Sequence, residues 1–133
     1  MAATFELEMV TPERLLFTQA AKIVTVPGQE GVFGVMPGHT RFLTALRPGP
    51  VIIGEGDQAI RYAVAGGYAE VLPERVTLLV DQALEQSRIT LEAAQKMVQT
   101  AEMALGGLSQ EHPDYARAQA NLDYAQTCLN LVR

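Results

Sequence analysis

Short apolar runs broken by polar residues fill the first eighty residues, a pattern that predicts β-strands. Phe5, Leu7 and Met9 alternate with two glutamates, and this period of two is typical of a strand with one buried face. Further apolar runs lie at residues 15–17, 21–26, 42–46, 51–53, 60–64, 68–72 and 76–80, the last of which we expect to be the final strand. Because turns rich in glycine and proline separate the runs, this part of the chain is predicted to be a β-sandwich.

Residues 27–39 hold four glycines and two prolines, a content that no helix tolerates. Between them lie apolar residues that a disordered linker would lack, namely Val32, Phe33, Val35 and Met36. We therefore predict a tightly folded corner between two strands. Its apolar side chains are expected to be buried, with Glu30 and His39 as its polar ends.

The pattern changes near Ser87, beyond which strand-like runs stop and alanine becomes the commonest residue. Apolar residues now recur at spacings of 3 and 4 in two series: Leu91, Ala94, Val98, Ala101 and Leu105, then Tyr115, Ala118, Leu122, Ala125, Leu129 and Val132. We expect Ser87 or Thr90 to be the N-cap of the first helix, and the helix to end at Gly106-Gly107. The fold class is thus β + α, with a β-sandwich over residues 1–86 and an antiparallel two-helix hairpin over residues 87–133.

Four of the eleven positions in this helix seam are alanine, which buries little area, so the hairpin alone should be marginally stable. We hypothesise that it can detach and rearrange. A second apolar stripe runs along each helix: Tyr124, Cys128 and Leu131 on one, Met97 and Ala104 on the other. This stripe packs against the sandwich or docks on another protein, and the pattern leaves both possibilities open.

Charge and composition exclude several classes of protein. The net charge of −5 argues against nucleic-acid binding and against direct contact with anionic lipids. No apolar run is long enough to cross a membrane, and the N-terminal residues lack the pattern of a signal peptide. The single cysteine, Cys128, excludes an internal disulfide and fits a reducing cytosol.

Candidate catalytic or ligand-binding residues are sparse. His39 and His112 are far apart and no second ligand has metal-site spacing, so no metal site is expected. Residues 27–39 match neither phosphate-binding glycine motif, and no serine has a nucleophile setting. His39 either contacts a partner or forms a hydrogen bond that fixes the turn. A free-standing ligand-binding β-sandwich stays open as an alternative function, whereas a small enzyme is disfavoured.

Several segments together resemble the epsilon subunit of F-type ATP synthases over essentially the whole chain. The segments are residues 10–14 with Phe17, residues 28–39, residues 43–49, Gly66-Gly67 with Glu70-Val71, residues 76–81 and residues 115–118. The resemblance implies a non-catalytic subunit of the central stalk, or rotor, which binds the gamma subunit and the c-ring and couples proton flow to ATP synthesis. It also implies peripheral attachment at the cytoplasmic face of the bacterial cell membrane.

The same resemblance implies which residues contact partners. The loop with Gly28, Glu30, Gly31 and Val32 is expected to face the c-ring, with Glu30 as its polar contact. The gamma-facing candidates are His39, Thr40, Arg41 and Phe42.

The hairpin departs from the family in two ways. Some members bind ATP there through an Ile-Asp-x-x-Arg-Ala motif, but this chain has Thr90 and Ala93 in place of the aspartate and arginine, so neither ATP nor another cofactor is expected. In many members the helices reach the alpha and beta subunits of the catalytic head and inhibit ATP hydrolysis, usually through a basic second helix. From residue 114 onward the only charges are Arg117, Arg133 and two aspartates, so we expect weak inhibition.

Overall fold

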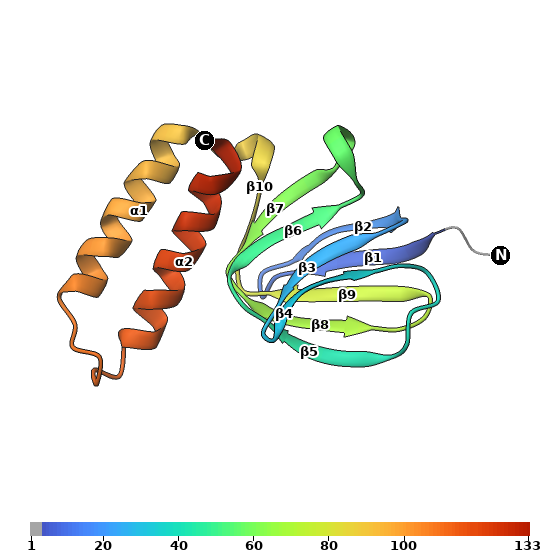
Figure 1. Ribbon diagram of the computed structural model, residues 1–133, viewed down its shortest axis with the longest axis horizontal. Helices are drawn as coiled ribbons and strands as arrows, with labels where there is room; N and C mark the ends of the chain where they lie inside the picture. The colour runs from blue at the N-terminus through green and yellow to red at the C-terminus, as the bar shows by residue number, and fades with distance from the viewer. Residues whose placement is uncertain (1–3) are drawn as a thin grey trace.

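The computed structural model describes residues 4–133 and shows a β-sandwich followed by two helices (Figure 1), which confirms the predicted fold class. The strands are β1 (Phe5–Val10), β2 (Leu15–Ala21), β3 (Val24–Gly28), β4 (Gly31–Val35), β5 (Phe42–Leu46), β6 (Gly49–Ile53), β7 (Ile60–Val64), β8 (Gly67–Val71), β9 (Arg75–Val80) and β10 (Ala83–Glu85). The helices are η1 (Gly56–Gln58) and η2 (Gln86–Arg88), both 3₁₀, and α1 (Leu91–Gly106) and α2 (Tyr115–Val132).

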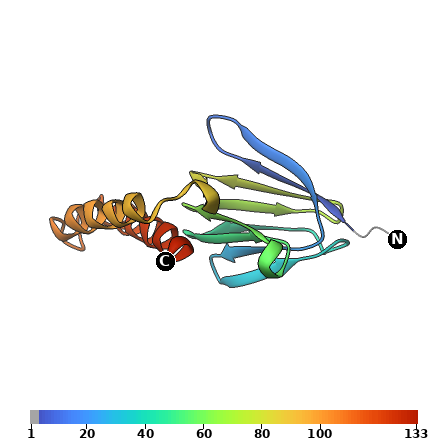
Figure 2. The ribbon, with the colours of Figure 1, turned by 90° about the horizontal axis from the view of Figure 1, so that it is seen from above.

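The strands are hydrogen-bonded in the order β10-β7-β6-β3-β5-β8-β9-β1-β2, and β4 pairs with β3. β1 and β9 are parallel, and the other pairs are antiparallel. This long sheet folds over itself into two layers (Figure 2). Phe17 of β2 and Tyr62 of β7 come from near opposite ends of the order, yet their ring centroids lie 5.4 Å apart.

The main core lies between these layers and is built by alternation. In β1 the side chains of Phe5, Leu7 and Met9 are buried while the residues between them are half-buried, as the sequence predicts. Branched aliphatic residues from the other strands complete the core. Burial of each large apolar side chain contributes about 1.5–3 kcal/mol, so this core holds the sandwich together.

The segment at residues 27–39 is not only a corner, and part of its predicted burial is wrong. It contains β4, which forms a hairpin with β3 through the turn at Gln29 and Glu30. Val35 is buried, but Val32 and Met36 are 61% and 60% exposed. Alternation along an edge strand explains this difference, because every second side chain points away from the core.

Two strand predictions also need correction. Residues 76–80 are not the last strand, because β10 follows and pairs with β7; its three residues are too few to show a period. Residues 21–26 do not form one strand: β2 ends at Ala21 and β3 begins at Val24.

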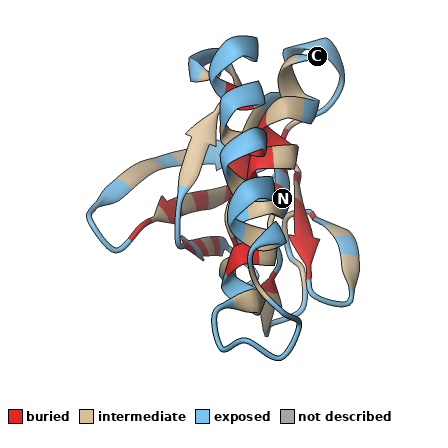
Figure 3. Cartoon of the chain, turned by 90° about the vertical axis from the view of Figure 1, so that its left-hand side faces the viewer, coloured by how far each residue is buried: buried red, intermediate tan, exposed pale blue. Residues whose placement is uncertain are grey.

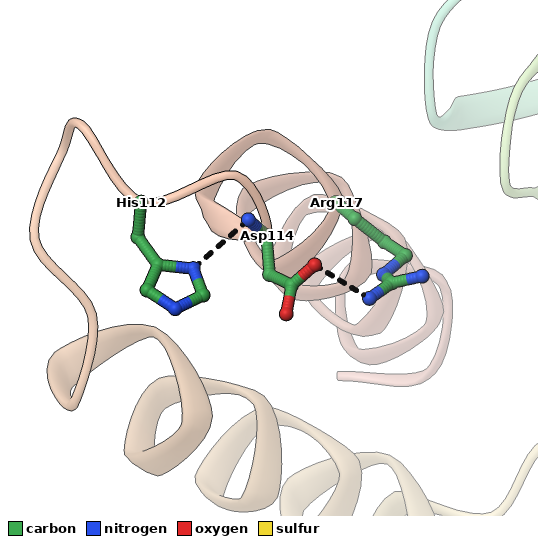
Figure 4. A network of polar contacts seen from close by, with 3 residues as sticks. All are labelled: His112, Asp114 and Arg117. Carbon is green, nitrogen blue, oxygen red and sulfur yellow. Dashed lines mark hydrogen bonds and ion pairs between the residues drawn. The ribbon is translucent and has the colours of Figure 1, made fainter.

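Local hydrogen bonds set where the two helices begin. The Oγ1 atom of Thr90 accepts a bond from the Ala93 N–H at 3.1 Å, so Thr90, and not Ser87, is the N-cap of α1. Before α2, the Asp114 N–H donates to Nδ1 of His112 at 3.0 Å. Arg117 forms an ion pair with the Asp114 carboxylate at 2.9 Å (Figure 4). These contacts are local to the hairpin turn, which fits a structural role for His112.

A second, smaller core joins the hairpin to the sandwich. It contains Ala63 of β7, Ala94 of α1, and Tyr124 and Cys128 of α2. On α2 the second stripe, including Leu131, therefore packs against the sandwich. On α1, Met97 packs against the same cluster, whereas Ala104 is exposed, and both line an open groove between the helices, so this part of the choice stays open.

The helix–helix seam buries only part of the predicted apolar series. Ala94 and Val98 are buried, but Leu91 at the start of α1 is exposed. Figure 3 views the molecule from the hairpin side, where much of the helical surface is exposed. Contacts with the sandwich therefore stabilise the hairpin alongside its own seam.

Candidate partner-binding surface

The eight predicted contact residues form two groups at opposite ends of β5. Gly28 pairs with Leu46 at the end of β5, so the loop at residues 28–32 lies there. Phe42 begins β5 and pairs with Val71, so the group at His39, Thr40, Arg41 and Phe42 lies at the other end. The fold therefore does not bring the two groups together, which fits contacts with two different partners.

At the first end, a tight β-hairpin presents Glu30 to solvent. Gly28 itself is buried, and a Cβ atom there would lie 2.7 Å from the Gly31 carbonyl oxygen. Its role is therefore to let β4 approach β3 closely. The exposed residues at this tip are Gln29, Glu30 and Val32. Val32 also lines an open depression that reaches Gln126 of α2, so the docked hairpin borders the tip.

At the second end, aromatic side chains fix the loop. The His39 and Phe42 rings lie 5.2 Å apart, and Phe42 lies 5.4 Å from Phe33. The His39 ring also forms a 3.0 Å hydrogen bond through Nδ1 with the Thr40 carbonyl, a local bond that supports the turn-fixing role. Thr40 and Arg41 are the exposed members of this group. Arg41 lines an open depression together with Glu6, Glu74 and Arg75.

A row of apolar residues on the exposed sheet was not predicted from the sequence. Strand register aligns five side chains across β5, β8, β9, β1 and β2, and we call this set the apolar row: Ala45, Tyr68, Leu79, Val10 and Leu15. Tyr68 is 55% exposed, Leu79 47% and Leu15 51%. An open groove follows the row and is lined by Val10, Ala45, Tyr68 and Leu79. Contiguous exposed apolar surface of this kind marks sites where proteins bind each other.

A polar set lies directly beside it on the same face. Register places Glu8, Thr77 and Glu70 side by side on β1, β9 and β8, and we call these three the acidic row. The Thr77 hydroxyl lies 3.4 Å from Oε1 of Glu8 and donates to it. One step further along, Glu6 and Arg75 form an ion pair at 2.7 Å. The outer face therefore carries an apolar row beside two carboxylates, Glu8 and Glu70, that form no ion pair within residues 4–133.

One sequence signal could have revealed the apolar row. The buried residues of β9 are Val76, Leu78 and Val80. Strict alternation predicts a polar, solvent-facing residue at the position between the last two, but the chain has Leu79 there. A single exposed apolar residue is common on protein surfaces, and it indicates an interface only when others lie beside it. The row as a whole stays invisible in the sequence because it depends on pairing between strands distant in the chain.

The docked surface of α2 is electrically neutral. Burial raises the pKa of the Tyr124 phenol, and the neighbouring Cys128 thiol raises it further. Burial also raises the pKa of the Cys128 thiol. Both groups therefore stay protonated at neutral pH, and Cys128 acts as a packing residue.

Groups that could perform chemistry do not gather in the described part of the chain. Residues 4–133 contain no cluster of three or more His, Cys, Asp or Glu side chains placed to hold a metal ion. Within the same residues, no helix is long and apolar enough to span a bilayer. The surfaces described above can bind proteins but do not assemble an acid–base pair or a nucleophile.

Comparison with known proteins gives a consistent family. The family described as "ATP synthase, Delta/Epsilon chain, beta-sandwich domain" matches residues 4–86. The ATP synthase epsilon chain of Magnetococcus marinus is 43% identical over 129 residues, covering 97% of this chain and 94% of that relative. The ATP synthase epsilon chain of Rhodospirillum rubrum is 40% identical over 121 residues, covering 90% of each chain.

Solved structures share the fold. A chain in the Euglena gracilis mitochondrial ATP synthase, solved as an OSCP/F1/c-ring complex, aligns with a TM-score of 0.77 at 21% identity, over 96% of this chain and 80% of that one. A chain in the Tetrahymena thermophila mitochondrial ATP synthase, solved as central stalk and c-ring, aligns with a TM-score of 0.58 at 14% identity, over 96% and 92%. From the family match and the identity to the relatives, the chain belongs to the ATP synthase delta/epsilon chain family and is a non-catalytic subunit.

Proposed function

We propose that this chain is a central-stalk subunit of an F-type ATP synthase and couples proton flow through the c-ring to ATP synthesis. The observation that carries the proposal is the apolar row, which lies exposed across five strands of a chain of this family. Exposed apolar surface on a small subunit calls for a protein partner. Chains of the same fold occur in a solved complex of OSCP, F1 and c-ring and in one of central stalk and c-ring.

The outer face is the proposed contact with the gamma subunit. The apolar row would form the centre of this interface, because Tyr68 supplies the kind of large aromatic anchor on which binding energy concentrates. Arg41 lines a depression with Glu6 and Arg75, which lie on the same face as the row. This neighbourhood supports a place for the His39–Phe42 group at the rim of the same interface.

The tip of the β3–β4 hairpin is the proposed contact with the c-ring. Glu30 and Val32 are exposed there, and they lie at the far end of β5 from His39. One subunit could thus bind gamma and the ring at the same time. Contact with the ring would hold the chain peripherally at the cytoplasmic face of the bacterial cell membrane.

The helix hairpin is proposed to be a weak regulatory arm toward the alpha and beta subunits. Arg117 already pairs with Asp114, and the other cation of this region is Arg133, the C-cap residue that follows α2. So little positive charge would attract an acidic partner only weakly. We do not propose ATP binding on the hairpin. The Thr90 hydroxyl already serves as the N-cap of α1, and Ala93 offers no cation that could pair with a phosphate.

The experiment is capture of gamma with the alpha and beta subunits by the full chain. Replacement of Tyr68 and Leu79 by serine removes the centre of the apolar row and is expected to weaken capture by at least about tenfold, the size typical of interface anchors. Met103→Ser is the matched control, because Met103 is an exposed apolar residue on α1. Capture that is unchanged in the Tyr68 and Leu79 variants would refute this interface.

A further inference from the structure

We propose that the partner segment covering the outer face presents a lysine or arginine side chain between Glu8 and Glu70. Apolar side chains of the same segment cover the apolar row beside it. The inference rests on the proposed function, because it specifies the chemistry of the gamma segment that binds this face. The occupant is a single segment of gamma that is both apolar and cationic.

Register places the two carboxylates within reach of one cation. Glu8 and Glu70 flank Thr77 on adjacent strands, with Glu8 opposite Thr77 and Thr77 opposite Glu70. Neighbouring strands lie about 4.8 Å apart, so the two Cα atoms are separated by about 10 Å. The Thr77 hydroxyl bonds to Glu8 and so restrains that side chain toward the middle of the row. A long cationic side chain that enters above Thr77 can therefore contact both carboxylates.

Within the described residues, no cation forms an ion pair with Glu8 or Glu70. Within residues 4–133 the ion pairs are Arg75 with Glu6 and Arg117 with Asp114. The Arg75 guanidinium is thus already engaged by Glu6, at 2.7 Å. A purely apolar partner would strip water from Glu8 and Glu70 without compensation, which is costly. A cation on the partner replaces that water with charge-assisted hydrogen bonds.

The same charges disfavour other occupants. The chain carries a net charge of −5, and a two-fold contact between copies would bring the acidic rows of both into one interface. Repulsion between the carboxylates of the two copies disfavours such a dimer. An anionic lipid surface is repelled for the same reason. A cationic segment of the stalk complements the face, and the acidic row would then keep the apolar row from joining copies of this chain.

The test measures binding of the full chain to purified gamma subunit from about 50 to 300 mM NaCl, a range over which screening of exposed charges changes strongly. Glu8→Gln, Glu70→Gln and the double variant are compared with wild type. Glutamine keeps the size of the side chain and can still accept the Thr77 hydrogen bond. Glu55→Gln, in the exposed turn after β6, is the control for loss of a surface charge.

Each single variant is expected to bind about threefold to tenfold more weakly at low salt, and the double variant to lose most of the salt dependence. Glu8→Lys should bind more weakly still. If the double variant keeps both the affinity and the salt dependence of wild type, the inference fails.

The serine variants at Tyr68 and Leu79 separate the two claims. If they lose binding while the glutamine variants do not, the apolar interface stands and the cation is refuted. If they bind as wild type does, the interface itself is wrong.

Discussion

The side-chain amide of Gln86 donates a hydrogen bond to the main-chain carbonyl of Leu131. Gln86 begins η2, the neck between sandwich and hairpin, and Leu131 lies in the last turn of α2. The neck therefore holds the end of the chain at the point where the hairpin meets the sandwich. This bond and the second core define the docked state of the hairpin.

Gln86→Ala is expected to loosen the docked hairpin without unfolding the sandwich. Loss of one hydrogen bond costs about 1 kcal/mol, or about a fivefold change in the undocking equilibrium. Native-state hydrogen exchange should show lower protection across α2 and unchanged protection in β1 and β9. Gln99→Ala, on the exposed surface of α1, serves as the control. Equal protection of α2 in both variants would remove the proposed role of the bond.

Docking of the hairpin should weaken at alkaline pH. Burial raises the pKa of Tyr124 and Cys128 above their ordinary values of 10.0 and 9.0. The docked hairpin therefore favours the neutral forms of both side chains. Their contribution to docking is fully present below about pH 9, the ordinary pKa of the thiol. Above that pH the contribution is lost, because Cys128 ionises in the undocked state before it does in the docked state. Protection factors of α2 should be level between about pH 6 and 8 and fall above about pH 9.

Cys128→Ala provides the matched variant for this pH profile. It removes the thiol titration, so the alkaline loss should begin nearer the ordinary pKa of tyrosine, 10.0. A protection factor that rises with pH, or a profile that Cys128→Ala leaves unchanged, would contradict the neutral packing described for these two groups.

Two glycines of the segment at residues 27–39 are expected to be essential for its shape. Gly38 has φ of +80°, and its N–H donates to the Pro73 carbonyl at 2.9 Å. A Cβ at Gly28 would meet the Gly31 carbonyl oxygen. Gly28→Ala and Gly38→Ala should each lower the free energy of unfolding by about 1–3 kcal/mol. Denaturant unfolding measures this loss.

Gly106→Ala is the control for these glycine variants. Gly106 is helical, and a Cβ there meets nothing within 4 Å. Alanine should therefore raise stability by up to about 1 kcal/mol through its helix propensity. Loss of stability at Gly106 equal to that at Gly28 would show that the effect is not specific to the β3–β4 corner.

Removal of the hairpin tests its regulatory strength. A chain ending at Gln86 retains every strand and is expected to raise ATP hydrolysis by the assembled enzyme by less than about twofold, because α2 carries little positive charge to dock in the head. A rise of tenfold would show that the hairpin inhibits strongly by other contacts. Equal incorporation of both chains into the complex is the necessary control.

The pattern of apolar and polar residues predicts the strands and helices of this fold, because strand alternation and helix spacing each depend on residues only a few positions apart. The alternation at Phe5, Leu7 and Met9 identifies β1, and the 3,4 spacing identifies α1 and α2. Ser87 and Thr90 fit the N-cap rule equally well in the sequence, and only the Thr90 bond to Ala93 decides between them. The glycine-rich segment predicts burial of Val32, but the structure exposes this side chain because it lies on the outward-facing side of an edge strand.

The candidate surface was less predictable than the fold. The predicted contact residues come from a resemblance, and among them Gly28 is buried. The apolar row exists only because β1 pairs in parallel with β9, which places Val10 beside Leu79 across nearly seventy residues of chain. No local pattern reports such a register, since it is set by long-range pairing.

The most direct test of the central claim is a cryo-electron microscopy structure of this chain within its own assembled ATP synthase. We expect Tyr68 and Leu79 to be buried against gamma, a cationic side chain to lie between Glu8 and Glu70, and Glu30 to face the c-ring. A chain bound in the stalk with its apolar row open to solvent would contradict that claim.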